Sequence, residues 1–271
     1  MSGAGNALTP ILERTRAEVA ARQGARPFGD VAQAAAIRRQ LDDTRDFAAA
    51  LGRPGLSVIA EHKRSSPSAG VIREGLELQD VVGAYERGGA AALSVLTETG
   101  SFGGSLDDLP RARAATSLPI LRKDFIVDPY QVLEAAAAGA DAILLIVAAL
   151  DAGTLRELHA HALAHGLDVL VEVHDAAELA VATDLGARII GINNRDLTTL
   201  QVDLGRTFEL LPQRPAGALI VAESGFRGRA ELERLARAGV DAVLIGEALM
   251  RAADIEAACR ALTGAPAPPA G

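Results

Sequence analysis

The sequence lacks the features that mark several large classes of protein. Its 271 residues contain a single cysteine, Cys259, so an intramolecular disulfide and a cysteine-based metal site are both excluded. The surrounding residues, AACRAL, predict a helix face and a buried or half-buried thiol. No apolar run approaches the roughly 20 residues that span a bilayer, which argues against a membrane protein. The amino-terminal stretch has no apolar block of the kind found in signal peptides, so we expect a cytoplasmic protein.

The sequence also lacks an excess of positive charge. It has 35 acidic and 27 basic residues, a net charge of −8, with the acids spread along the chain. A field of this sign disfavours nucleic-acid binding, so we expect no nucleic-acid partner. We also expect no membrane partner, and a monomer or weak homo-oligomer. An anionic substrate would have to be held by local lysine, arginine or backbone N–H groups. The composition, 49% hydrophobic and 23% charged, is typical of a soluble globular protein.

From Ser57 onward the chain repeats one pattern, a short apolar run, a polar tip and an amphipathic helix. The strand candidates are SVIAEHK (57–63), AALSVLTE (91–98), PILRKDF (119–125), AILLIVAAL (142–150), DVLVEVH (168–174), RIIGINN (188–194), LIVAESG (219–225) and AVLIGEA (242–248). Strands that alternate with helices predict a parallel sheet. Eight such units in about 200 residues fit an α/β fold, the closed (β/α)₈ TIM barrel. An open doubly wound sheet usually carries a Gly-rich loop after its first strand, and this sequence has none.

Three regions are expected. Residues 1–56 should form an N-terminal helical extension packed on the barrel, with a helix that starts near Thr9-Pro10. Residues 57–264 should form the catalytic barrel. Residues 265–271 are rich in proline, alanine and glycine and predict a disordered tail.

In this fold the active site lies at the carboxyl ends of the strands, where side chains alternate between the barrel interior and the surrounding helices. The polar residues predicted to converge there are Glu61, Lys63, Lys123, Glu172, Asn193, Arg195 and Glu223. His174 could also face this mouth, whereas His62 should point toward the helices. Burying so many ionisable groups is costly unless each finds a partner, so the set indicates chemistry. Ion pairs within a barrel layer, or solvated strand ends, are the structural alternative.

Glycines after the last two strands suggest a phosphate site. AESGF and LIGEALM each place a glycine where backbone N–H groups can face a ligand, as barrels of this kind often do for phosphate. Ser66 in the SSPS loop can add a hydroxyl. No HExxH motif is present, so we expect no metal site.

Eight blocks of the sequence, in order, resemble the indole-3-glycerol-phosphate synthase family. They are AEHKRSSPSAG, VLTETGSFGGSLDDL, LPILRKDFIVDPYQ, GADAILLIVAAL, LVEVHDAAEL, IIGINNRDLTTLQVD, VAESGF and GVDAVLIGEALM. The resemblance runs from about Ala60 to the last helix. It implies a monofunctional carbon–carbon lyase of tryptophan biosynthesis, without cofactor or metal, acting on a small phosphorylated substrate. The reaction converts 1-(2-carboxyphenylamino)-1-deoxyribulose 5-phosphate to indole-3-glycerol phosphate, CO₂ and water. The ILER start and the helix near Phe47 resemble the family's extra helical segment over the barrel mouth.

The resemblance also implies catalytic roles. Lys123 matches the general acid, and Lys63 matches the lysine that engages the anionic groups of the substrate. A neighbouring cation would lower a lysine's pKa toward the working pH. Glu61 and Glu172 match the catalytic carboxylates, and which proton each handles is left open. Asn193 and Glu223 resemble residues that hold the substrate in register.

The implied substrate-binding residues fall into three groups. Those for the aromatic ring are Phe102, Phe125 and Leu144, and Arg195 contacts the substrate. Those near the phosphate are Ser66, Ser224, Gly225, Gly246 and Glu247, the last through its backbone N–H.

The sequence leaves three rival functions open. A phosphoribosylanthranilate isomerase would use a Cys/Asp pair at strand ends, but Cys259 belongs to the last predicted helix. A Schiff-base aldolase would use Lys123 or Lys63 as a nucleophile. A catalytically inactive barrel could serve as a binding scaffold, although all four residues Glu61, Lys63, Lys123 and Glu172 are intact.

Overall fold

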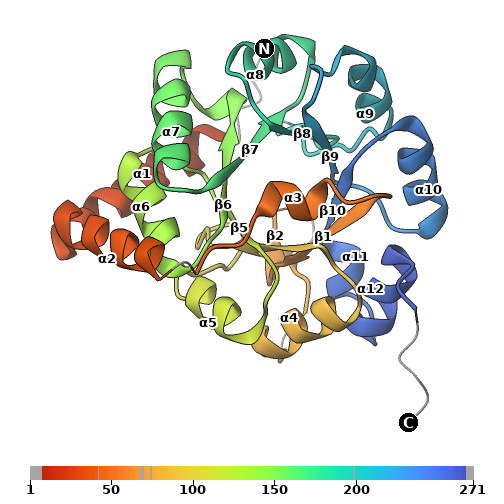
Figure 1. Cartoon of the computed structure of the whole chain (residues 1–271), viewed down its shortest axis with the longest axis horizontal. Helices are drawn as coiled ribbons and strands as arrows, with labels where there is room; N and C mark the ends of the chain where they lie inside the picture. Colours follow the sequence, from red (N-terminus) through yellow and green to blue (C-terminus); the bar gives the residue numbers. More distant parts are fainter. Residues whose placement is uncertain (1–7, 42, 68–69, 74, 198, 267–271) are drawn as a thin grey trace.

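The chain folds as a closed barrel of eight parallel strands surrounded by helices (Figure 1). The computed structural model describes residues 8–41, 43–67, 70–73, 75–197 and 199–266. The barrel strands are β1 (Ser57–His62), β4 (Ala92–Leu96), β5 (Ile120–Lys123), β6 (Ala142–Ile146), β7 (Asp168–Val173), β8 (Ile189–Asn193), β9 (Leu219–Glu223) and β10 (Ala242–Ile245). Each pairs in parallel with the next, and β10 returns to pair with β1, Ala242 beside Ser57. This confirms the TIM barrel predicted from the sequence.

Helices follow the strands and cover the outside of the barrel. They are α4 (Leu78–Arg87), α5 (Asp108–Ala115), α6 (Pro129–Ala138), α7 (Ala152–Ala164), α8 (Ala176–Asp184), α9 (Gly205–Leu210), α10 (Arg229–Ala238), α11 (Glu247–Met250) and α12 (Ile255–Thr263). Several begin with an aspartate that caps the first turn, such as Asp151, whose side chain accepts from the backbone N–H groups of Gly153 and Thr154. None of the helices within the described residues is long and apolar enough to cross a bilayer.

The apolar residues form two layers, as strand alternation requires. Outward-facing residues such as Val58 and Ile143 pack against the helices in the larger cluster. Inward-facing residues such as Ile59 and Leu144 fill the barrel in the smaller one. His62 is buried but does not line the central cavity, in agreement with its predicted outward direction. Burial lowers the pKa of His62 to about 4, so this histidine is neutral at ordinary pH.

The predicted end of the fourth strand, at residue 150, is wrong. The apolar run continues to residue 150, but β6 stops at Ile146 and Val147–Ala149 form a 3₁₀ turn, η1. Val147 and Leu150 pack against the outer core. These apolar residues therefore serve contacts with the helices rather than strand pairing.

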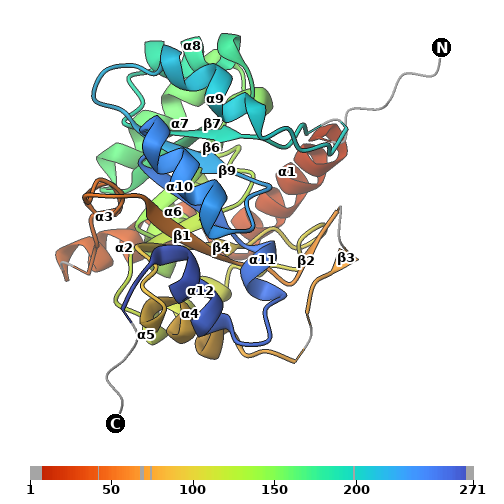
Figure 2. The same ribbon diagram turned by 90° about the vertical axis from the view of Figure 1, so that its right-hand side faces the viewer.

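Three helices precede the barrel: α1 (Leu8–Ala25), α2 (Phe28–Gln40) and α3 (Phe47–Leu51). α1 begins within two residues of the predicted start. Leu8 and Ile11 of α1 line the mouth of the barrel, which also carries the short hairpin of β2 (Ser65–Ser66) and β3 (Gly70–Val71) (Figure 2). The predicted disorder of the tail falls largely on 267–271, which lie outside the described residues.

The position expected for the helix near Phe47 is wrong. α3 does not lie over the mouth but closes the opposite end of the barrel, on the far side from α1 in Figure 2. Phe47 and Leu51 pack into the inner apolar layer, and the backbone N–H of Ala48 donates to Asp168 at 2.9 Å, at the first residue of β7. A resemblance in sequence gives the order of segments along the chain but not the end of the barrel on which each one packs.

Candidate active site

A cavity of about 870 Å³ opens at the carboxyl ends of the strands. The structure brings every site residue expected from the sequence to its wall: Glu61, Lys63, Ser66, Phe102, Lys123, Phe125, Leu144, Glu172, Asn193, Arg195, Glu223, Ser224, Gly225, Gly246 and Glu247. Such convergence follows from parallel strands, whose carboxyl ends all meet at one rim of the barrel.

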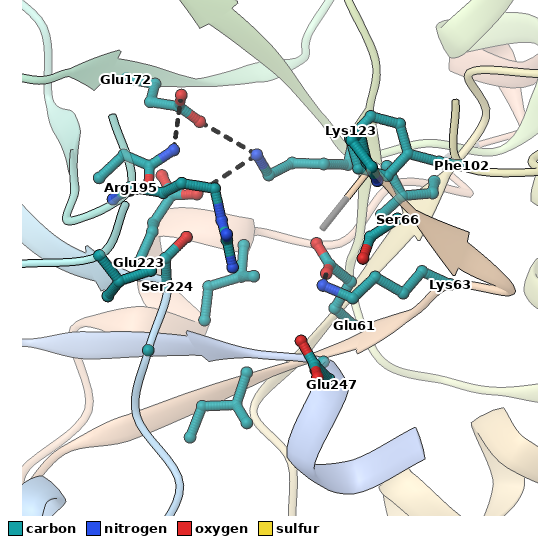
Figure 3. A pocket seen from close by; sticks show the side chains of 18 of the residues that line it. Glu61, Lys63, Ser66, Phe102, Lys123, Glu172, Arg195, Glu223, Ser224 and Glu247 are labelled. Atoms are coloured by element: carbon teal, nitrogen blue, oxygen red, sulfur yellow. Dashed lines mark hydrogen bonds and ion pairs between the residues drawn. The ribbon is translucent and has the colours of Figure 1, made fainter. Parts of the chain in front are cut away.

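Lys123, at the end of β5, lies between two buried carboxylates (Figure 3). Its Nζ is 3.0 Å from Oε2 of Glu172 and 3.3 Å from Oε2 of Glu223. The two glutamates are 1% and 2% exposed, so water screens these contacts little. Asn193 also donates to Oε1 of Glu172 at 3.0 Å. One ammonium therefore serves two acids in the interior of the barrel.

Glu61 and Lys63 form a second ion pair, across the cavity from Glu172 in Figure 3. Lys63 Nζ lies 2.8 Å from Oε1 of Glu61, and the Ser94 hydroxyl donates to Oε2 at 3.3 Å. The two residues are two positions apart in β1 and its extension, so they face the same side. A buried strand that ends in a carboxylate and an ammonium thus faces the cavity with both.

Two glycines make room for the buried carboxylates. A Cβ on Gly191 of β8 would lie 2.1 Å from Oε1 of Glu223, and one on Gly246 would lie 2.6 Å from Oε1 of Glu61. Neither distance is tolerable for a real side chain. The sequence assigned Gly246 to phosphate alone and gave Gly191 no role. Each of these glycines leaves room for a carboxylate on a neighbouring strand, which the sequence alone does not show.

The electrostatics differ from expectation at Lys123. Burial alone would disfavour the ammonium, but the carboxylates of Glu172, Glu223 and Glu61 outweigh burial and raise the pKa of Lys123 above its ordinary value. The expectation that a neighbouring cation would lower a lysine's pKa is therefore wrong here. Lys123 is an ammonium throughout the physiological range.

The two carboxylates beside Lys123 have widely different pKa values. Burial favours the neutral form of both, yet Lys123, His174 and Asn193 together hold the pKa of Glu172 well below its ordinary range. Burial raises the pKa of Glu223 to about 7, because the attraction of Lys123 is offset by repulsion from Glu172. Two acids whose environments separate their pKa values are suited to different proton-transfer roles.

His174, the position left open by the sequence, lies behind Glu172 rather than on the cavity wall. Its Nε2 is 3.3 Å from Oε1 of Glu172, and its Nδ1 is 3.0 Å from Oε2 of Glu178. Although burial opposes the charged ring, these two carboxylates raise the pKa of His174 to about 10. The imidazolium helps to keep Glu172 ionised.

Glu98 is a buried carboxylate at this end of the barrel that sequence reasoning did not single out. It pairs with Arg14 of α1 and accepts the backbone N–H groups of Ser101 and Phe102 at 2.7 and 3.0 Å. Glu98 therefore holds both the loop that carries Phe102 and the helix over the mouth. The signal available in the sequence was a glutamate two residues after a buried strand, in LTETG.

A second signal was the scarcity of lysine. Lys63 and Lys123 are the only two lysines in the sequence, and both line the cavity. Among the described residues, no group of three His, Cys, Asp or Glu side chains is placed to hold a metal ion.

A closed parallel barrel whose mouth gathers lysines, carboxylates and an arginine defines a (β/α)₈-barrel enzyme. Solved structures with this fold include 3-hexulose-6-phosphate synthase from Salmonella typhimurium, with a TM-score of 0.63 and 16% identity, covering 77% of this chain and 97% of that chain. The tryptophan synthase complex from Pyrococcus furiosus matches with a TM-score of 0.56 and 16% identity, over 77% of this chain and 98% of that chain. At such identities the likeness shows the fold alone.

Sequence comparison defines the family. The sequence profile for indole-3-glycerol phosphate synthase matches residues 8–262. A relative of that name from Rhizorhabdus wittichii is 49% identical over 265 residues, 96% of this chain and 99% of the relative. Indole-3-glycerol phosphate synthase 2 from Streptomyces coelicolor is 51% identical over 220 residues, 81% of this chain and 85% of the relative. The chain belongs to the indole-3-glycerol phosphate synthase family.

Proposed function

We propose that the protein is an indole-3-glycerol phosphate synthase, a decarboxylating carbon–carbon lyase of tryptophan biosynthesis. The substrate is 1-(2-carboxyphenylamino)-1-deoxyribulose 5-phosphate, and the products are indole-3-glycerol phosphate, CO₂ and water. The proposal depends mainly on the surroundings of Lys123. Its half-buried ammonium faces the cavity between two buried carboxylates, one held ionised and one with a pKa of about 7. Family membership supplies the substrate.

The first step is ring closure. The ring carbon that bears the carboxylate bonds to the ketone carbon, and the carbonyl electron pair moves to oxygen, which takes a proton. Lys123 is the general acid in this proposal. Its raised pKa keeps it protonated, and Glu223, 3.3 Å away, can return a proton to it. Lys123 can thus return to the ammonium form after it has donated its proton, and the neighbouring carboxylates keep their cation.

Decarboxylation follows. CO₂ leaves, and the electron pair of the broken bond returns to the ring and restores its aromaticity. Phe102, Phe125 and Leu144 offer the apolar wall for the ring, and Lys63 and Arg195 offer cations for the anionic groups. Holding the reacting atoms in register in this way can supply several kcal/mol of the barrier reduction.

Dehydration completes the indole ring. The hydroxyl on the former ketone carbon leaves as water with one added proton, and a base removes a proton from the adjacent carbon. We assign the base to Glu172, because its low pKa keeps it ionised. The added proton comes from Lys123, which protonated this oxygen in the first step and which Glu223 can reprotonate. Glu61, paired with Lys63 on the other side of the cavity, is the second carboxylate of the site.

Phosphate is assigned to the end of the cavity formed by β9 and β10. Ser224, Gly225 and Gly246 line it there. The side chain of Glu247 pairs with Arg251 at 3.0 Å, which supports a contribution through its backbone N–H. Ser66 approaches from the loop after β1. We place the reaction in the cytoplasm and assign it to a barrel of residues 57–264. In this proposal the protein acts as a monomer or weak homo-oligomer, and it requires no nucleic acid, cofactor or metal.

The test is direct turnover. Purified protein is mixed with the substrate without added metal, and indole fluorescence and CO₂ release are followed together. Equal amounts of both products are expected. A folded protein that binds inorganic phosphate but yields neither product would refute the synthase and favour an inactive scaffold or another anionic sugar phosphate.

A Schiff-base aldolase is less consistent with the site, because a lysine with a raised pKa is rarely the free amine that such a nucleophile must be. Borohydride reduction in the presence of an aldehyde sugar phosphate separates the two reactions. A mass increase at Lys63 or Lys123 would favour the aldolase, and an unmodified protein is expected.

A further inference from the structure

The backbone turn after β9 has a conformation that needs support. Ser224 has a φ of 66°, in the left-handed region that side chains other than glycine rarely adopt. Gly225 follows with a φ of 94°, and both residues line the cavity. Because Ser224 carries a Cβ, its conformation is strained and persists only where the surrounding structure holds it.

Asn194 supplies that support from behind the turn. It follows Asn193 at the end of β8, is 0% exposed and, unlike Asn193, does not line the cavity. Its side-chain Nδ2 donates to the carbonyl of Ser224 at 3.2 Å, and its backbone N–H donates to the carbonyl of Glu223 at 3.0 Å. A carbonyl held on the outer side fixes the peptide plane that follows it, and with it the direction of the Gly225 N–H.

The other polar atoms of Asn194 fix its own position. Oδ1 accepts from the backbone N–H and the hydroxyl of Thr207 in α9, at 3.1 and 2.9 Å. The backbone carbonyl accepts from the N–H of Asp203 at 2.9 Å. A single buried residue thus joins the turn after β9 to α9 through its side chain and to the loop between β8 and α9 through its backbone carbonyl.

That loop packs directly on the turn. A Cβ at Gly225 would lie 2.5 Å from a methyl group of Val202 and 2.8 Å from one of Leu204. These two residues flank Asp203, the residue bound by the carbonyl of Asn194. Asn194 therefore determines both the shape of the turn and the position of the loop that covers it.

We propose that Asn194 is a positioning residue for the phosphate subsite, acting through the left-handed conformation of Ser224. The proposal rests on the proposed function, which assigns phosphate to this turn. Asn194 touches no substrate in it. Its Nδ2–H holds the Ser224 carbonyl outward, so that the backbone of Ser224 and Gly225 faces the phosphate group. Without this hydrogen bond the turn relaxes toward ordinary φ values, and the anion loses affinity.

The key variant is Asn194→Asp, which keeps the acceptor for Thr207 and replaces the donor that faces the Ser224 carbonyl. We expect the KM for substrate and the competitive inhibition constant of inorganic phosphate to rise together by about tenfold, which corresponds to about 1.4 kcal/mol of binding. The kcat should change by less than about threefold, since the hydrogen bond acts on binding rather than on the reacting atoms. A fall in kcat at unchanged KM would overturn the proposal. If this variant fails to fold, Asn194→Ser, which removes the donor without adding charge, is judged by the same criterion.

The matched control is Thr207→Val. It removes one hydrogen bond from the same network, the hydroxyl donated to Asn194, and leaves the bond to Ser224 in place. It should lower the melting temperature while phosphate inhibition stays within about threefold of the parent. Equal losses of phosphate affinity in the Thr207 and Asn194 variants would mean that the network matters only for general stability.

A coupling measurement identifies the mechanism. Glycine adopts positive φ readily, so in a Ser224→Gly background the turn needs less support. Asn194→Asp should then weaken phosphate binding by less than about threefold further. Fully multiplicative effects of the two substitutions would show that Asn194 does not act through the conformation of residue 224.

Failure of this inference is distinguishable from failure of the proposed function. Binding of inorganic phosphate, measured by calorimetry, requires no turnover. If the parent protein does not turn over the substrate but binds phosphate and Asn194→Asp weakens that binding, the synthase assignment fails while the positioning role stands. If the parent is active and Asn194→Asp binds phosphate normally, the positioning role is wrong.

Discussion

Replacing Lys123 by alanine gives the sharpest test of the site, because the substitution removes the ammonium from a pair of buried acids. Glu172 and Glu223 would each lose a cation at 3.0 and 3.3 Å while remaining almost fully covered. Two independent quantities should change. The rate should fall because an acid is lost, and the stability should acquire a new dependence on pH.

Removing one partner of a buried ion pair typically costs about 3–5 kcal/mol. The lower figure, about 3 kcal/mol, is expected near neutral pH, because His174 and Asn193 still contact Glu172. Without the ammonium, the pKa values of both carboxylates rise. A group whose folded-state pKa is raised contributes stability that is present below its unfolded-state pKa and lost as the pH rises through its folded-state pKa. The stability gap between parent and variant should therefore be larger at pH 8 than at pH 5.

The assay combines urea unfolding at the two pH values with indole fluorescence for turnover. General acid catalysis contributes about 10²–10⁴-fold, so kcat should fall by at least two orders of magnitude. Lys63→Ala is the control for loss of a lysine. Among the cavity carboxylates Lys63 pairs only with Glu61, so this substitution should reduce the free energy of unfolding by less than Lys123→Ala does. With only two lysines in the chain, ¹⁵N-lysine labelling gives a direct reading. The side-chain signal absent from Lys123→Ala should titrate above the ordinary lysine range.

Two results would refute this reasoning. A stability gap that is equal at the two pH values, or larger at pH 5, would mean that the carboxylates do not depend on Lys123 for their charge. Turnover within about threefold of the parent would remove Lys123 from the acid role altogether.

Three further predictions follow from the same cavity. Glu172→Gln should remain folded by circular dichroism yet lose kcat by about 10²-fold or more, because an amide cannot take a proton; near-normal turnover would place the base elsewhere. The kcat of the parent should fall as the pH rises through about 7, where Glu223 loses its proton; persistence of this limb in Glu223→Gln would assign it to another group. Arg14→Met should free Glu98 and raise KM by about tenfold with little change in kcat, whereas a pure loss of kcat would contradict a role in holding the loop after β4.

The barrel and the composition of its mouth could be predicted because both depend on local patterns. Alternation along a strand separates Glu61 and Lys63 from His62, and parallel strands bring their carboxyl ends together whatever the intervening helices. No knowledge of packing was needed for either step. The same patterns could not show where β6 ends, since an apolar residue serves a strand and a helix contact equally well.

The features that could not be predicted depend on contacts between distant segments. Arg14 and Glu98 are 84 positions apart, and the need for glycine at position 191 arises from Glu223 on the neighbouring strand. The pKa of Lys123 had the wrong expected direction for the same reason. Its sign depends on which charges surround the ammonium in space, and three of them are carboxylates from other strands.

The use of lysine supports a site built for proton transfer. Of 27 basic residues, two are lysines and the rest are arginines. Where a buried cation serves structure, the chain uses arginine, as at Arg122, which is 1% exposed and pairs with Asp124 at 2.9 Å. Arginine is never deprotonated in proteins and so cannot act as an acid. A chain that replaces lysine by arginine almost everywhere retains it at Lys63 and Lys123, each in contact with a carboxylate. At Lys123, the general acid of the proposed reaction, a permanent charge would not suffice.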